Sequence, residues 1–147
     1  MKISDRDMAI YKAIFDPVLE WLDVEVYKKN PKPGFNMEEW VFAKNANGKI
    51  VENFCIIGYL WKINDFEPTR KYGSAIIDDI IRLYDFDDED MVFEVLDRLS
   101  AVEDKNGKSL GYDICTIKPY QAAAAIRYFL KTRKIKWKKF LDDDQLM

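Results

Sequence analysis

The chain contains no histidine, and this absence removes much of the chemistry open to a small protein. Without an imidazole, neither a Ser-His-Asp nor a Cys-His catalytic arrangement can form, and a His-ligated zinc site is excluded. The two cysteines, Cys55 and Cys115, are too few for a structural zinc site, and their apolar surroundings are typical of buried free thiols in a cytoplasmic protein. The enzymatic routes that remain use carboxylates, a carboxylate-bound divalent metal, lysine, tyrosine or an isolated cysteine.

Glycine-rich phosphate loops and long apolar segments are also missing. The six glycines are dispersed along the chain rather than gathered into a Walker-type loop. The longest apolar run, Phe54–Trp61, is far shorter than the roughly 20 residues that a membrane-spanning helix needs. The N-terminal segment places two acids before its apolar residues and has no small-residue cleavage site, unlike a secretion signal. We therefore expect a cytoplasmic protein without membrane contact.

The length of 147 residues predicts a single globular domain, 1–147, and the turn-rich segment 103–111 is where a sub-boundary would fall. An apolar content of 48% is enough to offset the entropy of an ordered chain. Its pattern predicts an α+β fold that is predominantly helical, with about five helices and one small β-hairpin or short antiparallel sheet.

Helix-start signals precede most of the segments with helical spacing. Ser4 and Asp7 resemble a capping box and Asp16-Pro17 a second start, so residues 5–27 should form one kinked helix or two abutting ones. We expect its inward residues to be Ile10, Ile14, Leu19 and Trp21 or Leu22. The other expected helices are 75–84 capped by Ser74, a helix from Asp87 or Asp88 with the stripe Met91, Val92, Val95, Leu96 and Leu99, and 119–133 opened by Pro119.

Three further segments are less regular. Asn47-Gly48 is the favoured pair for a tight hairpin turn between 40–43 and 49–51. Residues 54–63 are apolar almost all round, so a buried helix capped by Asn53 and a central strand are both open, and the length favours the helix. Residues 112–117 suggest a short strand, and Ile135 and Trp137 suggest an edge strand or a fraying last turn.

Charge is strongly segregated near the end of the chain. Between Asp78 and Asp104 there are eleven acids and two arginines, whereas Lys118 to Lys139 holds eight basic residues and no acid. Such asymmetry bears on binding partners more than on fold. A surface dense in carboxylates can bind a basic protein or imitate the phosphates of DNA. Here the basic block dilutes the second role.

The acidic run Asp85–Asp90 also invites a calcium interpretation. Asp85, Asp87 and Glu89 stand at the first three side-chain ligand positions of an EF-hand loop. The sixth position is Asp90 rather than glycine, however, and the twelfth is Leu96 rather than glutamate. We therefore favour acids that satisfy the free N–H groups at a helix start, and we expect no metal site.

The basic segment 126–140 interleaves cations with aromatic residues. Arg133, Lys134, Lys136, Lys138 and Lys139 could hold a phosphate backbone while aromatics stack on bases. Alternatively, the aromatics face the core and the lysines form the solvent side of the same element, which we favour. Trp137, set among lysines, is the tryptophan we expect to be exposed and to anchor an interface.

The order Trp40…Gly48…Cys55-x-x-Gly58-x-Leu60, followed by Tyr84–Asp88 and an apolar helix at 92–99, resembles a family of short uncharacterised bacterial and phage proteins. The chain lacks the Trp-Asn-Asp triplet of that family and adds a basic C-terminal extension. The resemblance implies no activity and no site residues. The composition also resembles that of phage accessory proteins.

These observations lead to three hypotheses. The first is a non-enzymatic protein-interaction module, such as a phage or mobile-element inhibitor of a host protein, that binds through the acidic 78–104 surface. Its expected partner-binding residues are Asp85, Asp87, Asp88, Glu89, Asp90 and Trp137. The alternatives are a nucleic-acid-binding protein that uses Arg133, Lys134, Lys136, Lys138 and Lys139, and a carboxylate- or metal-dependent enzyme. We expect no catalytic residue, cofactor or metal, and homo-oligomerisation stays open.

Overall fold

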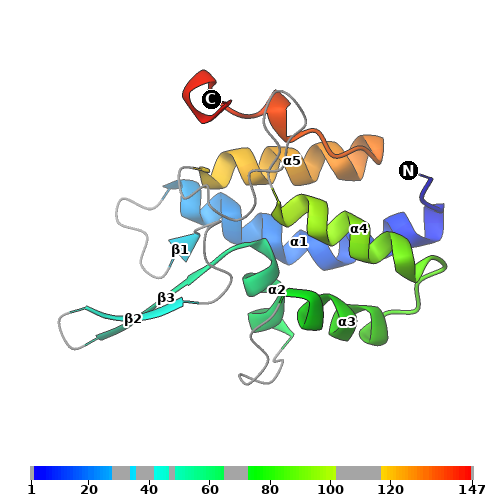
Figure 1. Cartoon of the computed structure of the whole chain (residues 1–147), viewed down its shortest axis with the longest axis horizontal. Coiled ribbons are helices and arrows are strands. Elements are labelled where there is room, and N and C mark those ends of the chain that lie inside the picture. Colours follow the sequence, from blue (N-terminus) through cyan, green and yellow to red (C-terminus); the bar gives the residue numbers. More distant parts are fainter. Residues whose placement is uncertain are drawn as a thin grey trace.

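Five α-helices make up most of the chain that the computed structural model describes (Figure 1). They are α1 (Asp5–Tyr27), α2 (Ile56–Ile63), α3 (Gly73–Leu83), α4 (Glu89–Ser100) and α5 (Pro119–Thr132), followed by the 3-10 turns η1 (Trp137–Lys139) and η2 (Asp143–Leu146). The backbone is described for residues 2–27, 34–35, 42–46, 49–64, 73–101 and 117–146. Side chains are described for 2–23, 55–64, 75–101, 117–143 and 145. The expected linker 103–111, residues 112–116 of the strand expected at 112–117, and Cys115 lie outside these residues.

α1 and α5 pack against each other and run antiparallel (Figure 1). Their interface is aromatic: the ring of Phe129 meets the ring of Tyr11 at 5.4 Å and that of Phe15 at 6.5 Å, both edge-on. Such edge-to-face contacts are favourable beyond the area they bury. α1 is one helix with Pro17 inside it, so residues 5–27 do not form the two abutting helices that were the alternative. The helix predicted from Pro119 is confirmed and ends at Thr132.

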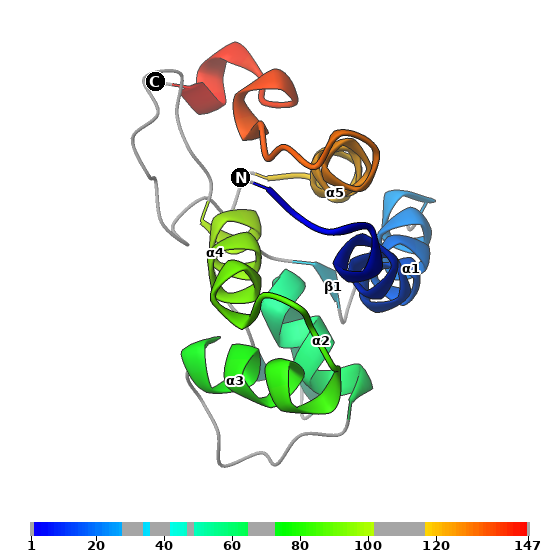
Figure 2. The ribbon, with the colours of Figure 1, turned by 90° about the vertical axis from the view of Figure 1, so that its right-hand side faces the viewer.

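α4 packs on α2 and α3, and α2 also contacts α1, so the helices enclose one core (Figure 2). The stripe predicted for α4 is confirmed, since four of its five members are fully buried: Val92, Val95, Leu96 and Leu99. On α3, Ile76, Ile77 and Ile80 face the core, whereas Leu83 is 55% exposed.

The helix starts follow local hydrogen bonding. The hydroxyl of Ser4 accepts the N–H of Asp7 at 3.1 Å, so Ser4 caps α1 as predicted. α2 begins at Ile56, where the sulfur of Cys55 accepts the N–H of Gly58, and Asn64 ends it as predicted. The cap expected at Asn53 is wrong because Asn53 lies in a strand. Ser74 lies inside α3, which begins one residue earlier, so it is not the cap.

Three short strands precede α2: β1 (Gly34–Phe35), β2 (Phe42–Ala46) and β3 (Lys49–Phe54). β2 and β3 pair antiparallel around 47–48, where the sequence predicts a hairpin, and β1 pairs parallel to β3. The predicted α+β class is nevertheless wrong. The part of the chain with described side chains is 77% helical and contains no strand or sheet. Among the described side chains, the core is formed by the buried stripes of the helices, which face one another.

The segment after α5 folds back over the core (Figure 2). Arg133 ends the helix in the left-handed region at φ 64°, which turns the chain. Ile135 and Trp137 then point inward, and the Trp137 indole N–H donates to the carbonyl of Arg98 at 3.0 Å. The prediction that Trp137 is exposed is therefore wrong, because only 1% of this residue is exposed. The expected edge strand is wrong as well, since η1 begins at Trp137.

A reciprocal amide pair closes the C-terminal segment. The side chains of Gln121 and Gln145, both buried, donate to each other at 2.7 and 3.1 Å. Each amide oxygen accepts one more N–H, that of Lys118 or that of Asp142. Because all four groups are satisfied, the pair ties η2 to the start of α5 without a buried unpaired amide.

The burial of Trp137 can be tested by truncation. Trp137→Ala should lower the free energy of unfolding by roughly 3–5 kcal/mol, because it leaves a large cavity. The matched control, Phe93→Ala on the exposed side of α4, should cost about 0.5 kcal/mol or less. Urea unfolding followed by circular dichroism measures both, and equal effects of the two substitutions would contradict the assignment.

Candidate functional site

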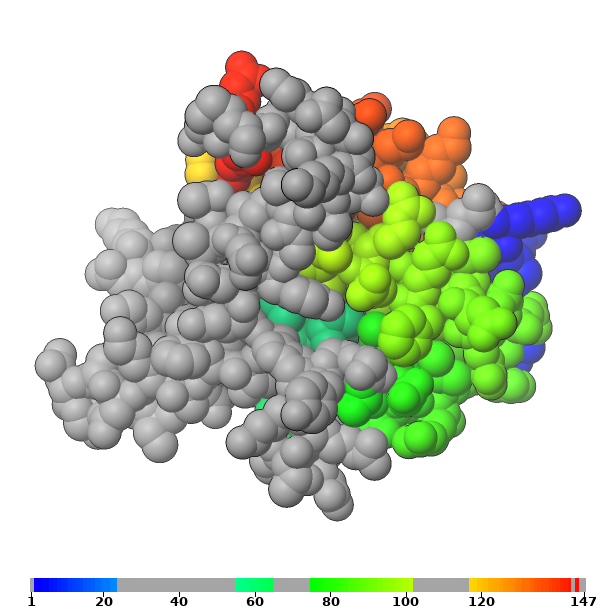
Figure 3. Space-filling model, viewed as in Figure 1, coloured from blue at the N-terminus to red at the C-terminus, as the bar shows by residue number. Residues whose placement is uncertain are grey.

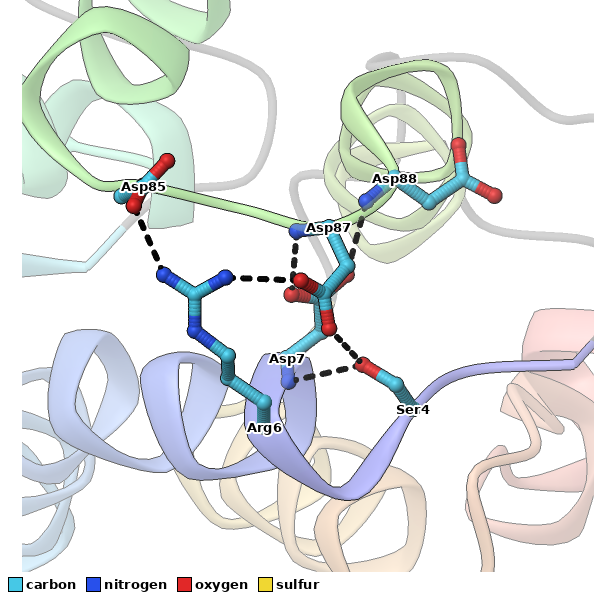
Figure 4. A network of polar contacts seen from close by, with 6 residues as sticks. All are labelled: Ser4, Arg6, Asp7, Asp85, Asp87 and Asp88. Atoms are coloured by element: carbon cyan, nitrogen blue, oxygen red, sulfur yellow. Dashed lines mark hydrogen bonds and ion pairs between the residues drawn. The ribbon is translucent and has the colours of Figure 1, made fainter.

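A buried carboxylate joins the start of α1 to the start of α4 (Figure 4). Only 1% of Asp7 is exposed, and its two oxygens accept the backbone N–H groups of Asp87 at 2.8 Å and Asp88 at 3.0 Å. Both N–H groups would otherwise be unpaired at the start of a helix. The positive end of the α4 dipole adds to the stabilisation of the negative charge. Asp7 thus serves a helix eighty residues away rather than completing a capping box with Ser4.

A second layer of polar contacts covers Asp7 (Figure 4). The carboxylate of Asp87 accepts hydrogen bonds from the hydroxyl of Ser4 at 2.9 Å and from Arg6 at 2.7 Å. Arg6 also reaches Asp85 at 2.8 Å, so one guanidinium bridges two acids of the run. These bonds, Ser4 first and Arg6 second, hold the pKa of Asp87 below its ordinary value.

The acidic residues predicted to bind a partner therefore divide into two sets. Asp85, Asp87 and Asp88 are occupied within the molecule, the last as N-cap of α4, where it accepts the N–H of Met91 at 3.1 Å. Glu89 and Asp90 are exposed and make no ion pair with the described side chains. Within the described residues there is no group of three side chains suited to hold a metal ion.

Further exposed acids lie on the same side of α4 as Glu89 and Asp90. Glu89, Asp90, Phe93, Glu94 and Asp97 are all exposed and recur at three- and four-residue spacing, opposite the buried stripe. We call these five residues the α4 face; α4 lies on the side of the molecule seen in Figure 3. Phe93, which is 39% exposed, was not predicted as a site residue, although its position off the apolar stripe indicates exposure. Arg98 approaches Glu94 only to 3.9 Å.

The basic block divides in the same way. Arg127 pairs with Asp23 of α1 at 2.7 Å, and Arg133 binds Asp5 and the carbonyl of Ile3. Arg133, a predicted nucleic-acid ligand, is thus engaged in the fold. The other four predicted ligands, Lys134, Lys136, Lys138 and Lys139, are exposed. The aromatics Phe129 and Trp137 are buried, which confirms that the lysines form the solvent-exposed side of this segment.

Two buried groups are unsuited to nucleophilic chemistry. Burial raises the pKa of the Cys55 thiol to about 12, so that it stays protonated at neutral pH. Burial also raises the pKa of the Tyr11 hydroxyl, and the carboxylates of Asp7 and Asp88 raise it further. Cys55 is a buried free thiol, as predicted.

Comparison of the chain with protein-family models, curated proteins and solved structures gave no match. None of the helices in the described part combines the length and apolar character that crossing a membrane requires. The fold and the site together define a helical protein with a group of exposed carboxylates on one face of α4.

The hydrogen bonds of the Asp7 carboxylate predict a loss of stability when this carboxylate is replaced. Asp7→Asn should lower the free energy of unfolding by roughly 1–3 kcal/mol, because the buried amide offers one oxygen to the two N–H groups that the carboxylate binds. The same change at exposed Asp90 should cost about 0.5 kcal/mol or less. Urea unfolding at neutral pH measures both, and an Asp7→Asn protein as stable as the Asp90 control would refute the role.

The lowered pKa of Asp87 predicts a pH dependence. A carboxylate whose pKa is depressed by folding stabilises the protein above its ordinary pKa of 3.8, and this contribution is lost as the pH falls through the folded value. The stability difference between wild type and Asp87→Asn should therefore shrink between about pH 6 and about pH 3. A difference that stays constant over this range would show that the charge of Asp87 is not involved.

Proposed function

We propose that this chain is a non-enzymatic protein-interaction module that binds a basic surface of a partner protein through the α4 face. The finer form of the proposal is a cytoplasmic accessory protein of phage or mobile-element origin that inhibits a host protein. It rests on the resemblance and the composition described above. The site is narrower than the acidic 78–104 surface predicted from the sequence, because part of that run holds the fold together.

One observation carries the proposal: an exposed aromatic ring lies among four carboxylates on one helix face. The carboxylates attract and orient a basic partner over several ångströms. Phe93 then supplies apolar area that is buried on contact, as aromatic anchors do in many interfaces. Three of the acids, Glu89, Asp90 and Asp97, make no ion pair with described side chains, so binding need not first break an internal contact.

Nucleic-acid binding is the second candidate, and the exposure of Lys134, Lys136, Lys138 and Lys139 favours it. Base stacking would need exposed aromatics beside these lysines. Trp137 is buried, however, and Arg133 is bound to α1, so the segment retains charge but little stacking surface. A carboxylate-dependent enzyme stays a third proposal, without a cluster of ligands in the described residues to support it.

The proposal is tested by neutralising the α4 face. The face-neutral variant carries Glu89→Gln, Asp90→Asn, Glu94→Gln and Asp97→Asn. A protein captured from a bacterial lysate by the immobilised wild-type chain, and identified by mass spectrometry, should bind this variant roughly tenfold more weakly or worse. The melting temperature should change little, because none of the four residues supports the core.

The matched control neutralises the four lysines as glutamines and should bind the same protein as wild type does. Equal binding by the face-neutral variant would refute the proposal. Retention of labelled single-stranded DNA at low salt, lost in the lysine variant, would establish the second candidate instead.

A further inference from the structure

A row of exposed lysines follows α5. Ile135 and Trp137 are buried, whereas the lysines around them are exposed, so these lysines point away from the core. None of them makes an ion pair with a described side chain. We call the four residues of this row the lysine patch: Lys134, Lys136, Lys138 and Lys139.

The lysine patch is held beside α4. The indole N–H of Trp137 donates to the carbonyl of Arg98, near the end of α4, at 3.0 Å. In Figure 3 the segment after α5 (orange) borders α4 (yellow-green) on the same face of the molecule. The buried side chains of Ile135 and Trp137 fix the backbone of the patch, and among the described side chains no ion pair joins the patch to the α4 face. The two oppositely charged surfaces therefore remain available to another molecule.

Both surfaces also present aromatic area. Phe93 of the α4 face is 39% exposed. Beside the lysine patch, the half-buried rings of Tyr128 and Phe140 meet at 5.8 Å, and the Nζ atom of Lys139 lies 4.8 Å from the centre of the Tyr128 ring. Aromatic area that is buried between charged groups adds to their attraction.

We propose that the lysine patch binds the α4 face of a second copy of this chain. Four lysines without an ion pair among the described residues meet four carboxylates, of which only that of Glu94 approaches a described cation. Surfaces of opposite potential attract and orient each other, and every copy carries both of them. The inference rests on the proposed function, since it uses the same face and names a partner for it.

The contact is expected to be weak but selective. Exposed ion pairs contribute little individually, because water screens them and long side chains lose freedom when they pair. Several such pairs beside an aromatic contact form together only in a restricted set of arrangements. Their attraction falls as the salt concentration rises.

Sedimentation velocity on the full chain, at concentrations up to about 1 mM, detects an association of this weak kind. The wild type should associate as its concentration rises, and more weakly at high salt. The face-neutral variant defined above should raise the dissociation constant roughly tenfold or more. A patch-neutral variant should do the same; it carries Lys134→Gln, Lys136→Gln, Lys138→Gln and Lys139→Gln.

A swap variant tests the pairing itself, because it exchanges the two charges and keeps the net charge of −3. It carries Glu89→Lys, Asp90→Lys, Glu94→Lys and Asp97→Lys with Lys134→Glu, Lys136→Glu, Lys138→Glu and Lys139→Glu. This variant should associate with itself, since reversed face meets reversed patch. It should not associate with the wild type, since like charges then meet. Excess unlabelled wild type should therefore shift the sedimentation of labelled wild type, and excess swap variant should not.

The control variant, Lys12→Gln with Lys131→Gln, removes exposed cations outside the patch and should associate like wild type. Circular dichroism checks that each variant is folded, and the two neutral variants decide the question if the swap variant is not. A wild type that stays monomeric at all concentrations would overturn the inference. Association that the patch-neutral variant retains, or an equal shift by the swap variant, would overturn it as well.

The two proposals can fail separately. If the wild type is monomeric and a captured partner still depends on the α4 face, the proposed function stands alone. If the face-neutral variant loses neither a captured partner nor self-association, both proposals fail.

Discussion

The carboxylate of Asp7 is buried, and its need for hydrogen-bond donors fixes how α1 and α4 meet. An isolated buried carboxylate is costly, so it must keep its hydrogen-bond donors. Here the donors are the N–H groups of Asp87 and Asp88, on a different element. If α1 and α4 separated or slid, the buried carboxylate of Asp7 would lose both of these hydrogen bonds. The orientation of α4 is thereby set, together with the direction in which its exposed face points.

α1 also explains why the two charge blocks do not neutralise each other. Arg6 of α1 forms ion pairs with Asp85 and Asp87 of the acidic block. Asp5 and Asp23, also of α1, form ion pairs with Arg133 and Arg127 of the basic block. α1, a helix of mixed charge, thus pairs with members of both blocks. The exposed members keep their charge: the acids of the α4 face and the lysines at 134, 136, 138 and 139. This exposed charge is the physical basis for the proposed function.

Local signals predicted most helices, because caps and spacing of three to four residues act within one turn. The predicted fold class was wrong because a hairpin signal at 47–48 is local and does not say how much of the chain forms a sheet. The prediction that Trp137 is exposed was wrong because the alternation of Ile135 and Trp137 with lysines shows which side of the segment is apolar. It does not show which residues cover that side. The partner of Trp137, the carbonyl of Arg98, is 39 residues away. The candidate site was half predictable: Glu89 and Asp90 make no ion pair with described side chains, whereas Asp87 and Asp88 are bound by residues about eighty positions earlier.

The central claim is that the Asp7 carboxylate binds two backbone N–H groups at the start of α4. Amide hydrogen exchange of the native protein, followed by NMR, tests it most directly. The account predicts that the Asp87 and Asp88 amides exchange as slowly as the amides in the middle of α1. It also predicts that the first-turn amides of Glu89 and Asp90 exchange fast. Exchange of Asp87 and Asp88 as fast as that of Glu89 and Asp90 would contradict it.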